Sequence, residues 1–213
     1  MPTARYEDKK GTRLPSVTQI LGQAWAKPAL VAWAHREGAR GRPLNKARDE
    51  AAEAGTAAHE LILAHIGGPD PDMSKYSDEA VAKARISNHH VQDWLEAHTF
   101  EPLVVEQPLV SDKMGYGGTP DWYGLLDGVP TVLDIKTGRL YPDQFVQMAG
   151  YRLLLQGLGH EVERMLLVRA PRTLGKSDRS TTSSRTGKEM IEPYERAWKA
   201  AFEIYKIKNI IGF

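Results

Sequence analysis

The fold predicted for this chain is decided by the stretch Gly118-Thr119-Pro120-Asp121 and, after twelve further residues, Asp134-Ile135-Lys136. Residues 131–136, Thr-Val-Leu-Asp-Ile-Lys, are β-branched and apolar up to their polar end, which is typical of a buried strand. The turn-forming sequence Leu-Asp-Gly-Val-Pro at residues 126–130 comes directly before them. Residues 118–136 are therefore predicted to form a hairpin.

This hairpin would place two acidic side chains and a lysine together. It can bring Asp121 beside Asp134, and Asp134 shares a strand face with Lys136 because side chains alternate along a strand. Two converging carboxylates repel each other unless a cation neutralises them, and hard oxygen ligands suit Mg²⁺ or Mn²⁺. A lysine beside them can stabilise developing negative charge. An Asp-x-Lys sequence alone is common at solvated strand ends, so this interpretation needs support from elsewhere in the chain.

Motifs on either side of the hairpin give that support. Gln147 and Tyr151 are four residues apart in a helix predicted over about residues 142–156, and therefore lie on one face of it. The ordered set Pro-Asp, Asp-Ile-Lys and Gln-x-x-x-Tyr resembles the PD-(D/E)XK nuclease superfamily, specifically its RecB-like exonuclease branch. Upstream, Gly55-Thr-Ala-Ala-His59 resembles the metal-binding histidine motif of that branch, and Leu14-Pro-Ser-Val-Thr18 resembles the start of its domains. The resemblance spans most of the chain.

The predicted elements indicate an α/β protein. Helices are predicted over about residues 16–24, 28–37, 46–66, 77–97, 142–156 and 193–206, and strands over 103–110 and 161–169 beside the hairpin. The resemblance implies the topology, a restriction-endonuclease-like core in which a central mixed sheet of four or five strands is flanked by helices. With 213 residues, the chain is expected to form a single nuclease domain, with an N-terminal helical layer over about 1–66 and a nuclease core over about 100–170.

The resemblance also implies a metal site. Asp121 and Asp134 would bind Mg²⁺ or Mn²⁺, and His59 and the carbonyl group of Ile135 would complete the protein ligands. The ion would activate a water molecule and offset charge on the scissile phosphate. Glu60 points about 100° away from His59 around the predicted helix and is expected on the surface.

Four further side chains are assigned roles near this site. By the resemblance, Lys136 would hold the attacking water or a phosphate oxygen, and Gln147 and Tyr151 would position the DNA backbone or support the lysine. Glu106 falls inside the predicted strand 103–110, where an acid among apolar residues is costly without a partner. It would be an additional carboxylate for the metal or for Lys136, or else a side chain on an exposed edge strand.

Two cationic segments are candidates for DNA contact. The first runs from residue 36 to residue 48 and is predicted to be a flexible loop that follows phosphates by charge, or a solvated linker. The second, residues 170–188, is rich in Ser, Thr and Gly, is predicted to be disordered without a partner, and would close over the DNA backbone. Trp25 and Trp33 are expected to pack in the N-terminal helical layer, with base stacking as the alternative. The candidate DNA-binding residues are Arg36, Arg40, Arg42, Arg172, Lys176, Arg179, Arg185 and Lys188.

Bulk composition limits which cofactors, partners and cellular compartments are expected. The formal net charge is +1, so any nucleic-acid footprint must be local. The sequence has no cysteine, which excludes disulfides and the iron–sulfur cluster that some RecB-like relatives carry. It contains neither a run of eighteen apolar residues nor a secretory signal, so no membrane association is expected. The predicted compartment is the cytoplasm, or the host cytosol if the chain is phage-encoded.

The function predicted from these features is a divalent-metal-dependent DNA nuclease, expected to act as an exonuclease in recombination, repair or replication. DNA with a single- or double-stranded end would be its substrate, and a recombination or replication protein is a further candidate partner. Two alternatives remain at this point: a catalytically silent nucleic-acid-binding module, and a nuclease that acts on RNA. A silent relative would be expected to lose an acid or the lysine, and this chain keeps all of them.

Overall fold

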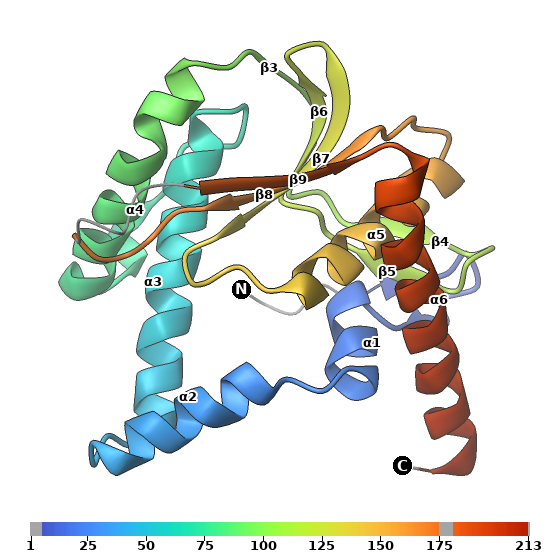
Figure 1. Cartoon of the computed structure of the whole chain (residues 1–213), viewed down its shortest axis with the longest axis horizontal. Coiled ribbons are helices and arrows are strands. Elements are labelled where there is room, and N and C mark those ends of the chain that lie inside the picture. The colour runs from blue at the N-terminus through green and yellow to red at the C-terminus, as the bar shows by residue number, and fades with distance from the viewer. Residues whose placement is uncertain (1–5, 175–180, 213) are drawn as a thin grey trace.

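The structure, a computed structural model, describes residues 6–174 and 181–212 and is built around a five-stranded sheet (Figure 1). In spatial order its strands are β3 (Phe100–Val105), β6 (Trp122–Leu126), β7 (Val129–Lys136), β8 (Arg164–Arg169) and β9 (Thr181–Thr186). The neighbours β7 and β8 are parallel and the other pairs are antiparallel, so the sheet is mixed. Two short ribbons accompany it: β1 (Tyr6–Glu7) with β2 (Arg13–Leu14), and β4 (Leu109–Ser111) with β5 (Tyr116–Gly118).

Helices cover both faces of the sheet (Figure 1). The layer on one face contains α3 (Leu44–Ala64) and α4 (Asp78–Glu96), and the layer on the other contains α1 (Val17–Ala24), α5 (Pro142–Gly157) and α6 (Lys188–Ile211). The helix α2 (Pro28–Ala39) connects the two layers, and a short 3₁₀ helix, Met73–Lys75, precedes α4. The predicted fold class, a mixed α/β sheet of four or five strands flanked by helices, is confirmed.

The side chains of β7 alternate between the two helical layers, as predicted. Leu133 and Ile135 pack in the hydrophobic cluster that includes Ile62 of α3. Val132 packs in the other cluster, among the side chains of α5. Asp134 and Lys136 have the same parity as Val132 and therefore belong to the α5 side of the sheet. This alternation directs the acid and the lysine toward the helix that carries Gln147 and Tyr151.

The predicted hairpin is formed by β6 and β7. The two residues of its turn, Asp127 and Gly128, have φ angles of 53° and 75°, the left-handed values that a tight turn between right-twisted strands requires. The register pairs Leu126 with Val129 and Trp122 with Leu133. Asp121 directly precedes β6, so the hairpin holds it opposite the end of β7.

Two segments that were predicted to be flexible contain helix or strand in their described residues. The cationic segment 36–48 consists of the end of α2, a short turn and the start of α3. Within 170–188, β9 pairs with the whole of β8, from Arg164 opposite Thr186 to Arg169 opposite Thr181. The polar composition misled the prediction because an edge strand gains its stability from backbone hydrogen bonds to a buried neighbour and can carry Ser and Thr. Lys176 and Arg179 lie outside the described residues.

The strand predicted over 103–110 is interrupted. β3 ends at Val105, Glu106 has a φ of 47°, and β4 begins at Leu109. The prediction that Glu106 lies inside this strand is therefore wrong, because the backbone leaves the extended region at this residue. The last helix is also longer than predicted: it runs from Lys188 to Ile211 and not from 193 to 206. No helix in the described part of the chain is long and apolar enough to span a membrane.

Candidate active site at the end of β7

The end of β7 holds a buried carboxylate that faces a lysine. The side chain of Asp134 is 2% exposed, and Lys136 Nζ lies 2.5 Å from its Oδ2 atom. No described donor makes a well-directed hydrogen bond to this oxygen. Burial, and then the negative charge of Asp121, raise the pKa of Asp134 to about 6, although Lys136 opposes the shift. The folded protein therefore keeps an under-satisfied carboxyl group at this position.

Lys136 is the counter-ion of this carboxylate. Burial disfavours its charged form, but the attraction of Asp134 and Asp121 outweighs that cost and raises the pKa of Lys136. The Lys136 side chain is 22% exposed, so part of it reaches solvent. A permanently charged lysine at a solvent opening can meet an incoming anion without first having to gain a proton.

Asp121 and His59 meet across the end of the sheet. Asp121 Oδ2 accepts a hydrogen bond of 2.7 Å from the backbone N–H of Ile135, so the hairpin itself fixes this carboxylate. His59, on α3, places Nε2 2.6 Å from the carbonyl oxygen of Ile135 and Nδ1 3.5 Å from Asp121 Oδ2. A carbonyl oxygen only accepts, so Nε2 carries a proton and donates. When the ring is neutral, the lone pair of Nδ1 then faces the carboxylate oxygen of Asp121. These two electron-rich atoms repel each other, and a cation bound between them would remove the repulsion.

The predicted site residues on α5 lie on the face of the sheet opposite to the one that α3 and His59 cover. Gln147 Nε2 donates to the hydroxyl oxygen of Tyr151 at 2.9 Å. The Tyr151 ring is buried, and burial together with the charge of Asp134 raises its pKa well above the usual range, so it remains a neutral phenol. The four-residue spacing predicted that the two side chains share a face, and the hydrogen bond confirms it. Their role toward DNA stays a prediction.

Glycine at position 118 makes room for this tyrosine. A Cβ atom at Gly118 would lie 2.8 Å from Tyr151 Cε1 and 3.0 Å from Val17 Cγ2. The site therefore depends on a missing side chain in the same stretch that carries Asp121. Gly55, one turn before His59, has a different environment: its Cβ would meet only the Thr137 hydroxyl, at 3.6 Å.

Replacing Gly118 with alanine is expected to destabilise the fold by about 1–3 kcal/mol, because the added methyl group overpacks a site closed by Tyr151 and Val17. Gly22 of α1 is the matched control, since a Cβ there meets nothing within 4 Å. Gly22→Ala should hold or raise stability by about 0.5–1 kcal/mol through its helix propensity. Urea denaturation of the two variants measures both effects. Equal stability of Gly118→Ala and the unmodified chain would contradict the close packing of Tyr151.

Glu106 lies beside the site, but in the segment between β3 and β4 and not within a strand as predicted. Its backbone N–H donates to the carbonyl oxygen of Asp121 at 3.1 Å, which places it beside the hairpin. Burial, and then the charge of Asp121, raise the pKa of the Glu106 carboxyl group. Both a left-handed backbone and a raised pKa at a charged residue cost free energy, and such costs gather at functional sites. A direct part in catalysis stays a prediction.

Glu60 was expected on the surface, and the structure corrects this. Its side chain is 17% exposed. One oxygen, Oε1, accepts from Lys75 Nζ and from the Tyr76 hydroxyl, each at 2.8 Å. The predicted angle of about 100° between Glu60 and His59 follows from helix geometry, but helix geometry could not show that the Met73–Lys75 turn covers this face of α3. The charge of Glu60 also contributes to the raised pKa of Glu106, so an acid missed from the sequence influences the site.

The donors do not surround a common point in this structure. Among residues 6–174 and 181–212, no three His, Cys, Asp or Glu side chains are grouped so as to hold a metal ion. The reason is that each donor already has a protein partner: His59 bonds to Ile135, Asp121 accepts from the same residue, and Asp134 faces Lys136. Ligation would require side-chain rotation. The donor chemistry fits a divalent ion, because carboxylate, carbonyl and imidazole groups meet at one strand end.

The candidate DNA-binding arginines of the first segment are largely neutralised. Arg40 and Arg42 both pair with the buried Glu37, at 3.0 and 3.1 Å, and Arg42 also pairs with Glu50 at 2.6 Å. Arg36 has no ion pair with another described residue, and it lines an open groove beside the start of α5. Contact of these residues with DNA stays a prediction.

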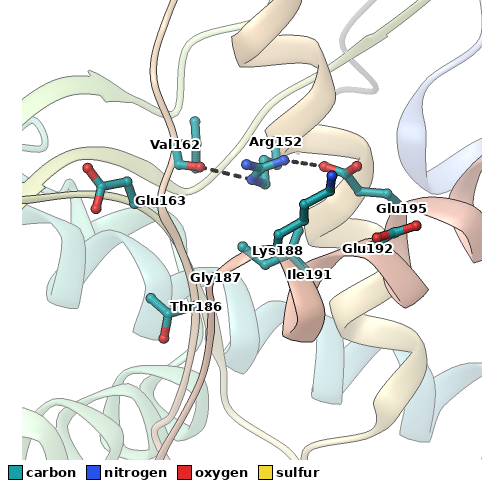
Figure 2. A pocket seen from close by; sticks show the side chains of 9 residues that line it. All are labelled: Arg152, Val162, Glu163, Thr186, Gly187, Lys188, Ile191, Glu192 and Glu195. Carbon is teal, nitrogen blue, oxygen red and sulfur yellow. Dashed lines mark hydrogen bonds and ion pairs between the residues drawn. The ribbon is translucent and has the colours of Figure 1, made fainter.

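The described candidates of the second segment lie in separate places. Arg172 Nη1 donates to the carbonyl oxygen of Ala51 at 2.6 Å, and burial lowers its pKa. Arg185 lies 4.6 Å above the ring of Phe145. Lys188, the first residue of α6, lines a cavity of about 610 Å³ (Figure 2). In that cavity Arg152 already donates to the Val162 carbonyl group and pairs with Glu195, so the charge of Arg152 is neutralised within the protein.

Comparisons with known proteins give only distant likenesses. No family model matches the chain, and no curated protein matches its sequence. Among solved structures, an alkaline exonuclease from Laribacter hongkongensis has 14% identity and a TM-score of 0.34, over 59% of this chain and 71% of that one. The same exonuclease in complex with dAMP has 16% identity and a TM-score of 0.34, over 73% and 84%. A phage-related exonuclease from Haemophilus somnus 129PT has 12% identity and a TM-score of 0.36, over 74% and 83%. Likenesses with TM-scores this low decide neither the family nor the activity of this chain.

Proposed function

We propose that the chain is a divalent-metal-dependent nuclease of the RecB-like PD-(D/E)XK type. It hydrolyses phosphodiester bonds in DNA and acts as an exonuclease in recombination, repair or replication. The observation that carries the proposal is the convergence of Asp121, Asp134, Lys136 and His59 at the end of one strand. Carboxylates supplied by a hairpin, a lysine beside them and an imidazole from another layer are groups that suit metal-assisted hydrolysis of a phosphodiester.

The metal would be Mg²⁺ or Mn²⁺, held by Asp121, Asp134, His59 and the Ile135 carbonyl group. When bound, such an ion supplies Lewis-acid stabilisation of the phosphate charge and a nucleophile at neutral pH. The raised pKa of Asp134 supports the assignment, because a buried carboxylate with a second acid beside it gains from a cation. The imidazole ligand favours Mn²⁺ as an alternative to Mg²⁺.

The chain's own residues have separate tasks in this proposal. Lys136 faces both Asp134 and solvent, so its ammonium group can hold an attacking water or a phosphate oxygen in place. Tyr151, kept neutral by burial, and Gln147 form a hydrogen-bonded pair that supports the lysine or contacts the DNA backbone. Glu106 is positioned to steady the Asp121 side of the site or to supply a further carboxylate.

End-labelled single- and double-stranded DNA, incubated with Mg²⁺, Mn²⁺ or EDTA, tests the proposal. Progressive shortening from an end with either ion, and none with EDTA, is expected. If the chain cleaved RNA but not DNA, its substrate would be RNA. If it bound DNA without cleaving it under every condition, it would be a catalytically silent binding module.

Metal binding is expected to stabilise the protein more at pH 8 than at pH 5. In the metal-free fold, the pKa of Asp134, about 6, lies above its unfolded value of 3.8. The folded state therefore binds the extra proton, and stability falls as the pH rises from about 4 through 6. An ion binds the ionised carboxylate and removes that penalty, so its effect grows above pH 6. Thermal melts with and without millimolar Mg²⁺ measure this. Asp134→Asn should lose the pH dependence of the melting-temperature gain, and an equal gain at both pH values in the unmodified chain would contradict the assignment.

A further inference from the structure

An open groove of about 770 Å³ adjoins the candidate site. It runs between the start of α2, with the residues before it, and the loop from β7 to α5. Three aromatic side chains line it: Trp25, Trp33 and Tyr141. Trp25 is 37% exposed and Tyr141 is 38% exposed, so both rings offer free surface. Exposed rings gathered in one groove with polar residues around them are typical of a surface that binds a partner or ligand.

The same groove carries cations that have no ion-pair partner among the described residues. Lys27, Arg36 and Arg139 line it, and none of the three makes an ion pair or a side-chain hydrogen bond with another described residue. Arg40 and Arg42, in contrast, are both held by Glu37. Asp143 is the acid among the lining residues, which leaves an excess of positive charge in the groove. A chain of formal net charge +1 therefore has a local basic footprint here.

One wall of the groove is formed by the loop that directly follows β7. Gly138 and Arg139 line it and follow Lys136 by only two and three residues. Asp143, also on its wall, is close enough to contribute to the raised pKa of Lys136. A polymer held in the groove would therefore lie against the loop that leaves the end of β7.

We propose that this groove binds the unpaired bases of a single strand of nucleic acid and leads that strand to the end of β7. Aromatic rings interleaved with cations recognise single strands, because the rings stack on exposed bases while the cations meet the phosphates. A duplex hides its base faces within the stack, so it cannot use the rings. The inference rests on the proposed nuclease function for its choice of ligand, and it names the form of substrate that the site receives.

Binding of fluorescein-labelled oligo(dT) in EDTA tests the groove separately from cleavage. Trp25→Ala and Tyr141→Ala are each expected to weaken binding roughly 5- to 100-fold, as the loss of one stacked base predicts. Arg36→Gln with Arg139→Gln should reduce the slope of log affinity against log salt by about 1.4, close to 0.7 for each lost phosphate contact. Lys113→Gln, an exposed change in the turn between β4 and β5, is the control and should bind like the unmodified chain.

Tryptophan emission adds a local readout. Trp25 and Trp33 line the groove, whereas Trp122 and Trp198 are fully buried and Trp94 packs in the cluster of the α4 layer, so a ligand in the groove should quench mainly Trp25 and Trp33. Trp25→Phe should keep most of the affinity, since phenylalanine also stacks, but lose part of the quenching. Normal oligo(dT) affinity in both Trp25→Ala and Tyr141→Ala would overturn the proposal, even if the chain cleaves DNA. If the unmodified chain has no nuclease activity but these variants bind oligo(dT) more weakly than it does, the groove would remain a single-strand binding site and the proposed nuclease function would be refuted. Dimerisation that Trp25→Ala abolishes, with oligo(dT) affinity unchanged, would assign the groove to a second copy.

Discussion

Asp134→Asn is expected to abolish DNA cleavage, with a loss of at least about a thousand-fold. The buried carboxylate has Lys136 as its protein counter-ion and would be the central metal ligand of the proposed site. Losing an ion that supplies several kcal/mol of charge stabilisation corresponds to a rate loss of this size. Asp121→Asn should have a comparable effect, and it should also weaken the hydrogen bond from the Ile135 N–H group that holds the hairpin end.

Initial rates on end-labelled DNA, with circular dichroism to confirm folding, measure the effect of these two changes. Asp112→Asn, in the exposed turn between β4 and β5, is the matched control and should cleave normally. A folded Asp134→Asn or Asp121→Asn variant with an ordinary rate would remove that residue from the active site.

Lys136→Met is expected to separate catalysis from metal binding. Turnover should fall by at least about a hundred-fold, because one charged group that meets the phosphate or the attacking water is lost. Metal affinity should hold or increase, since Lys136 is the cation that now faces Asp134 Oδ2 at 2.5 Å and competes with an ion for it. Methionine keeps the length and apolar stem of the side chain, which limits the disturbance of the fold.

Calorimetric titration with Mn²⁺ beside the cleavage assay measures the two effects of Lys136→Met. Lys199→Met, an exposed change on α6, serves as the control. A loss of Mn²⁺ affinity in Lys136→Met with turnover intact would show that the lysine has a structural role.

Features set by local sequence were predictable. The β6–β7 hairpin follows from Asp127-Gly128 between two apolar runs, and the alternation along β7 assigned Asp134 and Lys136 to one side. Ser16 caps α1 by accepting from the Gln19 N–H group at 3.0 Å, as its position before an apolar run suggests. The pairing of Gln147 with Tyr151 follows from helical spacing alone.

Features set by distant contacts were not predictable from patterns. β9 is polar and exists because β8 offers a full row of backbone partners, so composition indicated disorder where a strand forms. Glu106 leaves the extended region at a φ of 47° while its N–H group bonds to Asp121, a contact that no alternation rule could foresee. The pairing of Glu37 with Arg42 depends on the turn after α2, whereas its pairing with Arg40, three residues on, is a local helical contact.

The role of the aromatic residues at the N-terminal end also depends on tertiary structure. Trp25 and Trp33 could be assigned from sequence either to a packed layer or to base stacking. The structure leaves Trp25 partly exposed and brings Tyr141, more than a hundred residues later, to the same groove. Cations that appeared to form one basic segment are thereby divided between paired ones and those that face this groove.

The most direct test of the central claim is the anomalous difference density of crystals soaked in Mn²⁺. The account predicts one ion at the end of β7, at about 2.0–2.3 Å from Asp121, Asp134 and a ring nitrogen of His59. It also predicts that His59 turns away from the Ile135 carbonyl oxygen, which its Nε2 atom contacts at 2.6 Å in the metal-free structure. An ion bound elsewhere, or no ion at this strand end with His59 still bonded to Ile135, would contradict the proposed metal-dependent active site.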